Sequence, residues 1–351
     1  MQIDDKFLKE ISDILMAARA NAKRAVNLSM VYGYYEVGRK IYVEEQNEEG
    51  RAVYGKYIIK EVSKYLTEIM GRGYSVTNVK QMRQFYQVYS TDSIGQKFSD
   101  QFPNLPTIST GRKFFLSWSH YLLLMRIKNV DERHFYEIEA VKNNWSLDEL
   151  KRQYNSALYE RIALSTNKEE VYRLALEGQV IDNPMDIVKD PYILEFLNLP
   201  ELPEYSESDL ESRIISHLER FLLELGTGFA FIGRQVRFTY EEDHFKVDLV
   251  FYNRLLRCFV LFDLKIGKLT HQDIGQMQMY VHYYDRQVKL ADENKTIGIL
   301  LCRDKNDAVV QMTLPEDNDQ IFASKYEEVL PSKEELRKLL EEHLAEEDET
   351  E

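Results

Sequence analysis

Cysteine is scarce in this chain, which has two in 351 residues. Cys258 and Cys302 each lie within an apolar run that is typical of a strand. Two such thiols provide neither a disulfide framework nor the spaced ligands of a zinc site. We therefore expect both cysteines to be small residues of a buried core.

Long apolar runs are absent too, which excludes a membrane-spanning protein. Residues 1–6 lack the basic start and apolar stretch of a secretory signal, so we expect a cytoplasmic protein. The chain contains no Gly-rich phosphate loop, no Gly-x-Ser-x-Gly motif and no histidine pair at metal-ligand spacing. The composition, 44% hydrophobic and 30% charged, is that of a globular protein.

Basic residues are outnumbered, 45 against 59 acidic ones, for a net charge of −14. This balance argues against a protein that coats nucleic acid through bulk charge. However, many acids lie in the tail, and a metal site must itself be acidic. Binding to nucleic acid would therefore depend on local basic clusters.

The first half of the chain has a helical pattern, with apolar residues recurring every three or four positions. Ser75 follows the breaker Gly71-Arg72-Gly73, and Ser146 to Glu149 form a capping box, so both mark helix starts. Residues 91–112 predict a long irregular connection. The expected helices cover residues 5–27, 30–46, 53–70, 75–89, 116–128, 131–142 and 146–161.

Prolines 184, 191, 200 and 203 interrupt the pattern between Leu164 and Tyr205, and we place the domain boundary there. Beyond Ser208 the pattern is that of an α/β layer fold. We expect a helix at 208–225 that ends at Gly226, strands at 229–232, 235–240, 245–252, 257–264 and 296–302, and helices at 271–285 and after Ser332. The chain thus divides into a helical domain (1–165), a linker (166–205), an α/β domain (206–330) and an acidic tail (331–351).

An aspartate and a lysine stand at the end of the apolar strand 257–264. Asp263 and Lys265 share one face because they are two residues apart in a strand. Ligands commonly bind at such strand ends in α/β sheets. The alternative for an isolated Asp-x-Lys is a surface ion pair.

The preceding strand places Asp248 among apolar neighbours, where a carboxylate is unfavourable unless it is paired or bound to a metal. If Asn253 and Cys258 close a hairpin over residues 254–257, antiparallel counting sets Asp248 opposite Asp263. The two carboxylates would repel unless a cation lies between them, so at least one should have a raised pKa. Oxygen ligands of this kind favour Mg²⁺, with Mn²⁺ as the alternative, and Lys265 would assist the chemistry.

Three further residues are candidates for the same site. Gln276 and Tyr280 are four apart on one helical face, which an ordinary amphipathic helix would also produce. Glu211 either completes a capping box with Ser208 or supplies a third acid, with Glu219 and Glu224 as rivals.

A basic group follows the glycine turn of the helical domain. Arg72, Lys80 and Arg83 could contact DNA phosphates in a helix-turn-helix or winged arrangement. The alternative is an amphipathic packing helix with solvated charges.

These residues lie in segments that resemble the YhcG-like branch of the PD-(D/E)xK nuclease superfamily and its helical partner domain. The resemblance covers nearly the whole chain and rests on residues 221–235, 248–252 and 263–267, and on 71–78, 82–86, 116–121 and 144–150. It implies a restriction-endonuclease-like α/β domain with a mixed sheet. It matches Asp248 to the first metal aspartate, Asp263 to the D/E position, Lys265 to the lysine, and Gln276 with Tyr280 to a glutamine–tyrosine element. Val247 replaces the usual proline, and Asp263 is shorter than the glutamate of many members.

We therefore expect a metal-dependent DNA endonuclease that acts in recombination, repair or defence against mobile DNA. DNA would be its partner, and the helical domain would bind DNA or mediate assembly with a second copy or another protein. The alternatives are a non-catalytic DNA-binding or adaptor protein that retains the nuclease fold, and a structural domain with an incidental Asp-x-Lys.

Overall fold

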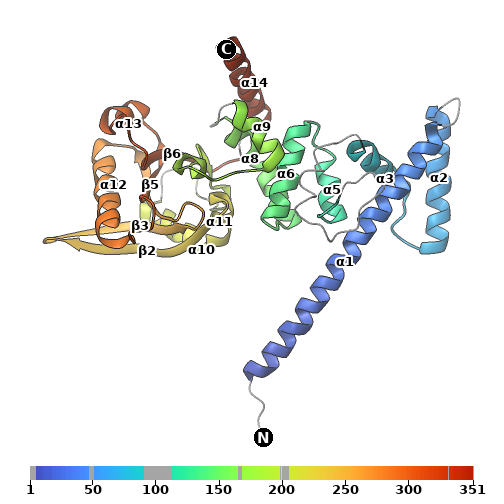
Figure 1. Ribbon diagram of the computed structural model, residues 1–351, viewed down its shortest axis with the longest axis horizontal. Coiled ribbons are helices and arrows are strands. Elements are labelled where there is room, and N and C mark those ends of the chain that lie inside the picture. Colours follow the sequence, from blue (N-terminus) through green and yellow to red (C-terminus); the bar gives the residue numbers. More distant parts are fainter. Residues whose placement is uncertain are drawn as a thin grey trace, which may run out of the picture. The chain divides into compact units, whose positions relative to one another are not determined.

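The computed structural model describes residues 5–46, 51–90, 113–164, 168–197, 199, 205–330 and 332–350. The chain forms two compact units, shown in Figure 1. The helical unit comprises residues 1–151 and 175–178, and the α/β unit comprises residues 152–174 and 179–351. The irregular connection expected at residues 91–112 lies outside the described residues.

The helical unit is built from helices whose starts follow the capping signals of the sequence. The Ser75 hydroxyl accepts the Asn78 amide at 3.3 Å, and Ser146 and Glu149 form the expected reciprocal capping box. The helices are α1 (Asp5–Gln46), α2 (Arg51–Met70), α3 (Val76–Tyr89), α5 (Trp118–Leu124) and α6 (Val130–Lys142), and the first residues of α7 (Leu147–Asn155) also belong to this unit.

Aromatic side chains form the centre of this unit. Tyr35, Phe85 and Phe114 are fully buried, with the Phe85 and Phe114 ring centroids 4.8 Å apart. Helices α1 and α3 cross in close contact, because a Cβ atom on Gly38 would lie 2.0 Å from the Met82 carbonyl oxygen. Glycine is therefore required at this crossing.

The second half of the chain alternates strands and helices around one sheet (Figure 1). Its order is β1-β6-β5-β4-β3-β2, antiparallel from β2 to β4 and parallel from β4 to β1, which makes the sheet mixed as expected. The elements are α8 (Leu158–Ala163), α9 (Lys168–Glu177), η1 (Pro184–Ile187), β1 (Tyr192–Ile193), η2 (Glu195–Leu197), α10 (Glu207–Ser216), α11 (Leu218–Leu225), β2 (Phe229–Tyr240), β3 (Asp243–Asn253), β4 (Cys258–Lys268), α12 (His271–Tyr283), η3 (Tyr284–Val288), β5 (Ile297–Asp304), α13 (Asp307–Thr313), β6 (Ile321–Glu327) and α14 (Lys333–Thr350).

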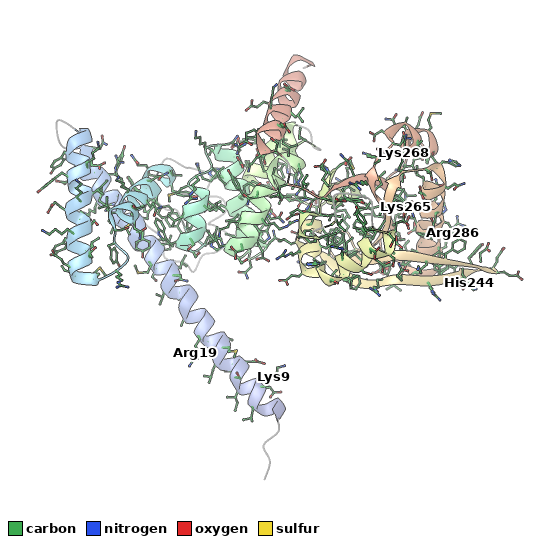
Figure 2. All side chains as sticks on the ribbon, turned by 180° about the vertical axis from the view of Figure 1, so that it is seen from behind. Lys9, Arg19, His244, Lys265, Lys268 and Arg286 are labelled. Carbon is green, nitrogen blue, oxygen red and sulfur yellow. The ribbon has the colours of Figure 1, made fainter. Side chains whose placement is uncertain are left out.

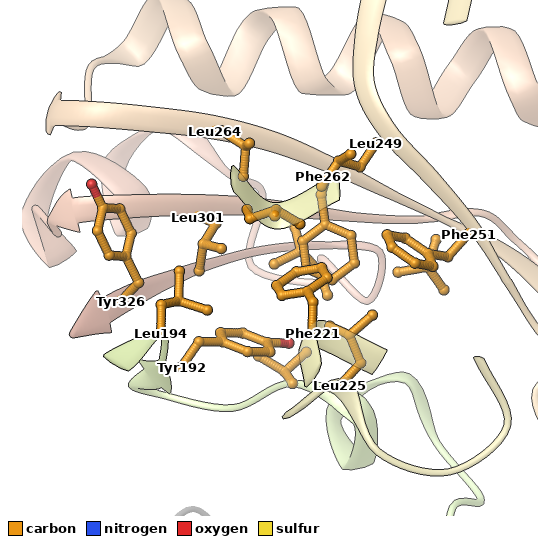
Figure 3. Close-up of a cluster of buried hydrophobic side chains, with 14 of the residues drawn as sticks. Tyr192, Leu194, Phe221, Leu225, Leu249, Phe251, Phe262, Leu264, Leu301 and Tyr326 are labelled. Atoms are coloured by element: carbon orange, nitrogen blue, oxygen red, sulfur yellow. The ribbon is translucent and has the colours of Figure 1, made fainter. Parts of the chain in front are cut away.

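Each face of the sheet is covered by helices. On one face Phe221 and Leu225 of α11 pack against Phe251 and Phe262, as Figure 3 shows. On the other face α12 lies across β5 so closely that a Cβ atom on Gly298 would be 2.5 Å from the Met277 sulfur. Burying each large apolar side chain contributes roughly 1.5–3 kcal/mol. Both cysteines are free and buried, as expected.

Several expected boundaries are wrong for local reasons. Residues 27–30 contain no Gly or Pro, so the two helices expected at 5–27 and 30–46 are one, α1. The helix expected at 146–161 breaks at Ala157, whose φ is 52°, and the helix expected at 208–225 breaks at His217. Strands expected at 229–232 and 235–240 join as β2, with a register shift between Phe231 and Gly233.

The segment interpreted as a linker contains regular structure in the α/β unit. Its short strand β1 pairs with β6, where Tyr192 lies beside Tyr326, and both side chains are buried. The alternation pattern missed β1 because two residues are too few to show a period. Strand β6 and helix α13 were missed as well.

Candidate active site

The site lies where strands β3 and β4 separate. Asn253 pairs with Cys258 across the turn 254–257, which confirms the expected register, and the ladder continues to Leu249 opposite Phe262. Asp248 and Asp263 are the next two residues on the two strands. The Leu264 amide donates to Asp248 Oδ2 at 2.9 Å, so a carboxylate takes the place of a ladder carbonyl. The sheet opens at these aspartates.

A pocket of about 430 Å³ occupies this opening. It brings together all six residues that the sequence proposed for the site: Glu211, Asp248, Asp263, Lys265, Gln276 and Tyr280. The remaining lining residues, which sequence reasoning did not select, are Glu207, Ser208, Gln235, His244, Phe245 and Lys246. The pocket therefore combines at least four carboxylates with two lysines.

Asp263 is the most perturbed acid of the pocket. Its side chain is 3% exposed, and Lys265 Nζ lies 2.9 Å from Asp263 Oδ2. Burial raises the pKa of Asp263, Lys265 opposes this, and the negative charge of Asp248 adds to it, so that the pKa is about 7. The raised pKa was expected from repulsion between the two aspartates, but burial is the larger cause.

Lys265 is held among acidic groups. Glu207 and Asp273 each lie within 4 Å of its ammonium, in addition to Asp263. Burial lowers the pKa of Lys265, but the attraction of Asp263 and the other acids outweighs it, so the pKa is raised overall. Lys265 is therefore protonated at neutral pH.

The structure excludes one of the two interpretations of Glu211. The cap of α10 is Ser206 with Asp209, so the capping box expected at Ser208 and Glu211 is wrong. Glu211 instead lines the pocket, and its pKa is raised by burial and by the charge of Asp248. Its rival Glu219 is exposed, and Glu224 is buried in an ion network with Arg161.

Gln235 is a residue that sequence reasoning missed. Its side-chain amide donates to both Glu211 and Asp248, at 3.2 Å from Asp248 Oδ1. Its φ is 51°, which is uncommon for a residue other than glycine and breaks the alternation of β2. The pattern of the strand contains no signal for this turn of the backbone, because glutamine has no preference for such a conformation.

Gln276 and Tyr280 contact each other across one turn of α12. The Gln276 amide donates to the Tyr280 hydroxyl, which donates in turn to the Lys246 carbonyl at 2.9 Å. Burial, followed by the nearby charge of Asp263, raises the pKa of Tyr280 to about 12. The pair therefore ties α12 to β3 at the pocket.

The donor set fits a hard divalent cation held by few protein ligands. Within the described ranges no three His, Cys, Asp or Glu side chains are arranged as a metal cluster. Instead, Gln235 donates hydrogen bonds to the carboxylates of Glu211 and Asp248, and Lys265 forms an ion pair with Asp263. Mg²⁺ needs only one or two carboxylates, because waters and substrate oxygens complete its shell.

Of the proposed DNA-binding residues, Arg72 lies in the turn before α3, and Lys80 and Arg83 lie on α3 itself. Arg72 and Lys80 are exposed. Arg83 is paired with the carboxylate of Glu45, which is 3% exposed. The structure thus leaves two of the three cations exposed and engages the third in an ion pair within the helical unit.

A mixed sheet that opens at two aspartates beside an Asp-x-Lys is the arrangement of PD-(D/E)xK nucleases. Residues 185–341 match the family described as YhcG PDDEXK nuclease domain, and residues 10–161 match the DUF1016 N-terminal domain. The chain is 39% identical over 341 residues to the Escherichia coli (strain K12) protein named "Putative nuclease YhcG", covering 93% of this chain and 90% of that one. The chain belongs to the YhcG nuclease family.

The matches of this chain to solved structures span about half of each of those chains. A repair endonuclease from Pyrococcus abyssi is 19% identical over 37% of this chain and 50% of that chain, with a TM-score of 0.26. The EndoMS–dsDNA2 complex is 18% identical over 38% and 48%, with a TM-score of 0.27. Among the helices of the described residues, none is long and apolar enough to cross a membrane.

Proposed function

We propose that this chain is a DNA endonuclease that hydrolyses phosphodiester bonds with the help of a divalent cation, Mg²⁺ or in its place Mn²⁺. The main support is that Asp248, Asp263 and Lys265 line one pocket, at the point where β3 and β4 separate. Recombination, repair or defence against mobile DNA is the proposed setting.

Asp248 and Asp263 are the residues proposed to hold the cation. When bound, the cation would lower the pKa of an attacking water and offset the charge of the scissile phosphate. A pKa near 7 means that the Asp263 carboxylate is poorly stabilised as an anion in its buried position. A bound cation would stabilise the Asp263 anion, and the position therefore favours a cation.

Lys265 and Glu211 have separate roles in this mechanism. Because the pKa of Lys265 is raised, its ammonium cannot remove a proton at neutral pH. It instead donates hydrogen bonds that position the attacking water and stabilise developing negative charge. Glu211 is the third acid, and Gln235 orients its carboxylate toward Asp248.

Gln276 and Tyr280 are proposed to position the pocket. Tyr280 is fully buried, and its hydroxyl proton is donated to the Lys246 carbonyl. It therefore fixes β3 against α12 beside the aspartates, and Gln276 fixes the tyrosine.

The net charge of the chain is −14, so DNA binding requires local positive charge. Basic side chains around the pocket supply it. Lys246 and His244 line the pocket, and Arg234 is 3.9 Å from Glu211 with half of its side chain exposed. Figure 2 shows Lys265 and Lys268 along β4 and His244 on the long β2–β3 hairpin. Lys246, His244, Arg234 and Lys268 are proposed to contact DNA phosphates.

A second DNA contact is proposed in the helical unit at Arg72 and Lys80. Replacing both with alanine should weaken DNA binding and reduce its salt dependence, because fewer counterions are released. Arg83→Ala should have a smaller effect on that slope, since Arg83 is paired with Glu45. An unchanged slope in the double variant would favour an assembly role for this unit.

The experiment that tests the function is a cleavage assay on linear, branched and single-stranded DNA, with Mg²⁺ and with EDTA. We expect cleavage with Mg²⁺ and none with EDTA. Asp263→Ala and Lys265→Ala should each reduce cleavage by about 100-fold or more while leaving DNA binding largely intact. Asp292→Ala, which removes an exposed acid paired with Arg257, is the matched control. Wild-type binding without cleavage would favour the alternative, a DNA-binding protein that retains the nuclease fold.

A further inference from the structure

The N-terminal half of α1 presents an apolar stripe that the described part of the chain leaves uncovered. Leu8, Ile11 and Leu15 are 50%, 42% and 58% exposed. Ala18, Ala22 and Ala25 continue the stripe and are exposed as well. Figure 1 shows this half of the helix extending away from the other helices of its unit.

The stripe has the spacing of a coiled-coil seam. Its six residues alternate steps of three and four, which keeps them on one side of a helix. Exposed Ile14 and Val26 flank it. Lys9 and Arg19, labelled in Figure 2, fall outside the stripe in the helical repeat. A single amphipathic face therefore runs along about 18 residues, or about 27 Å, of helix.

This face is separate from the one that packs within the helical unit. The buried residues of the second half of α1 include Val31, Tyr35 and Ile41. At about 100° per residue, the Ile11 and Leu15 side lies roughly half a turn around the helix from the Val31 and Tyr35 side. The stripe is thus not an extension of the internal packing face.

We propose that a second copy of this chain covers the stripe, with the two α1 helices antiparallel. In that orientation the larger side chains of each copy meet the alanines of the other: Leu8 opposite Ala25, Ile11 opposite Ala22, and Leu15 opposite Ala18. Every layer then has one large and one small residue, so the helix axes keep a constant separation. A parallel pair would be wide at the leucine end and narrow at the alanine end.

The charge along the sequence also favours the antiparallel pair. Residues 8–16 contain two acidic residues and one basic residue, whereas residues 17–26 contain three basic residues and no acidic one. Antiparallel helices place the more acidic half of each copy beside the basic half of the other. Parallel helices would place the two basic halves together, which is unfavourable.

The first test is the mass of the full chain in solution, measured by light scattering over a range of concentrations. Wild type should reach the mass of a dimer. Leu15→Glu should be a monomer at concentrations where wild type is dimeric. Met16→Asp is the matched control, because Met16 is 65% exposed but lies off the stripe, and it should remain dimeric. Helix content and melting temperature show whether each variant is folded.

The second test distinguishes the two orientations. In an antiparallel pair the two Leu8 positions are about 25 Å apart, because 17 residues separate Leu8 from its partner position. Leu8→Cys alone should therefore form no cross-linked dimer on oxidation, whereas a mixture of Leu8→Cys and Ala25→Cys chains should. The two native cysteines are buried, and the wild-type chain measures any cross-linking that they cause.

A wild type that stays monomeric would overturn the proposal, as would a Leu15→Glu chain that remains as dimeric as wild type. Dissociation by Met16→Asp would show that a different face of α1 is in contact. Cross-linking of Leu8→Cys with itself would replace the antiparallel arrangement with a parallel one.

Discussion

Two buried acidic centres of the α/β unit contrast with each other. Glu224 on α11 contacts Arg161 at 2.7 Å and Arg152 at 3.2 Å, and it accepts the Ile193 amide at 3.0 Å. Burial alone would raise the pKa of Glu224, but Arg161, Lys189 and Arg152 lower it to about 2. Asp263 has one cation, Lys265, beside a second aspartate, and its pKa is raised to about 7.

The difference lies in how completely each buried charge is compensated. Around Glu224 the cations outnumber the acids, so the protein itself compensates the buried negative charge. The network therefore holds the folded structure together. Around Asp263 the carboxylates outnumber the cations that contact them, so the centre remains favourable for a further positive group. Both centres are acidic and buried, and only their partners distinguish the Glu224 network from the proposed active site around Asp263.

The largest effect is expected on stability at the compensated centre. Glu224→Gln removes a charge that balances the buried Arg161 and the partly buried Arg152, and it should lower the free energy of unfolding by about 3–5 kcal/mol. Chemical denaturation measures this, with exposed Glu219→Gln as the control. Cleavage per folded molecule should be unchanged. A stable but inactive Glu224→Gln protein would contradict the comparison.

Glu211→Gln should show the opposite behaviour. The substitution keeps the shape of the side chain and removes one of the repelling carboxylates, so stability should stay the same or rise. Cleavage should fall by about 100-fold, because Glu211 is the third acid of the proposed catalytic set, beside Asp248 and Asp263. Kinetic assays beside denaturation of the same samples check this, and Glu219→Gln again serves as the control. If this variant cleaves like wild type, Glu211 is not part of the site.

The two centres should respond to pH with opposite signs. The folded pKa of Asp263, about 7, lies above its unfolded value, so its contribution to stability is lost as pH rises from about 4 to 7. Between pH 5 and 8, metal-free wild type should lose about 3 kcal/mol relative to Asp263→Asn. The folded pKa of Glu224, about 2, lies below its unfolded value, so its contribution is lost as pH falls from about 4.5 to 2. Denaturation at several pH values measures both, and parallel pH profiles for wild type and Asp263→Asn would refute the Asp263 assignment.

The smallest effect concerns Gln235, which bridges Glu211 and Asp248. Gln235→Gly should be about 1 kcal/mol more stable than Gln235→Ala, because glycine adopts a φ of 51° without strain. Both variants should bind Mg²⁺ with altered affinity, since the amide that separates the two carboxylates is gone. Denaturation and calorimetric titration test the two statements separately. Equal stability of the two variants would show that the backbone is unstrained at this position.

The sequence determined the parts of this protein that depend on local patterns. Apolar periodicity predicted most helices and the central strands, and the hairpin at residues 254–257 set Asp248 beside Asp263 because antiparallel pairing leaves no freedom once the turn is known. The Asp-x-Lys spacing placed Asp263 and Lys265 on one face, because residues two apart in a strand point to the same side.

Tertiary structure alone decided where the isolated acids lie. Glu211, Glu219 and Glu224 lie within one apolar-periodic segment, and only the break at His217 and the packing of α10 and α11 send one to the pocket, one to solvent and one to the arginines. Two other features also depend on residues that are distant in the sequence. Strand β1 pairs with β6, and the Gln235 side chain contacts the carboxylates of Glu211 and Asp248. Sequence patterns record the neighbours along the chain, whereas the charge state of a buried acid depends on partners brought from elsewhere in the fold.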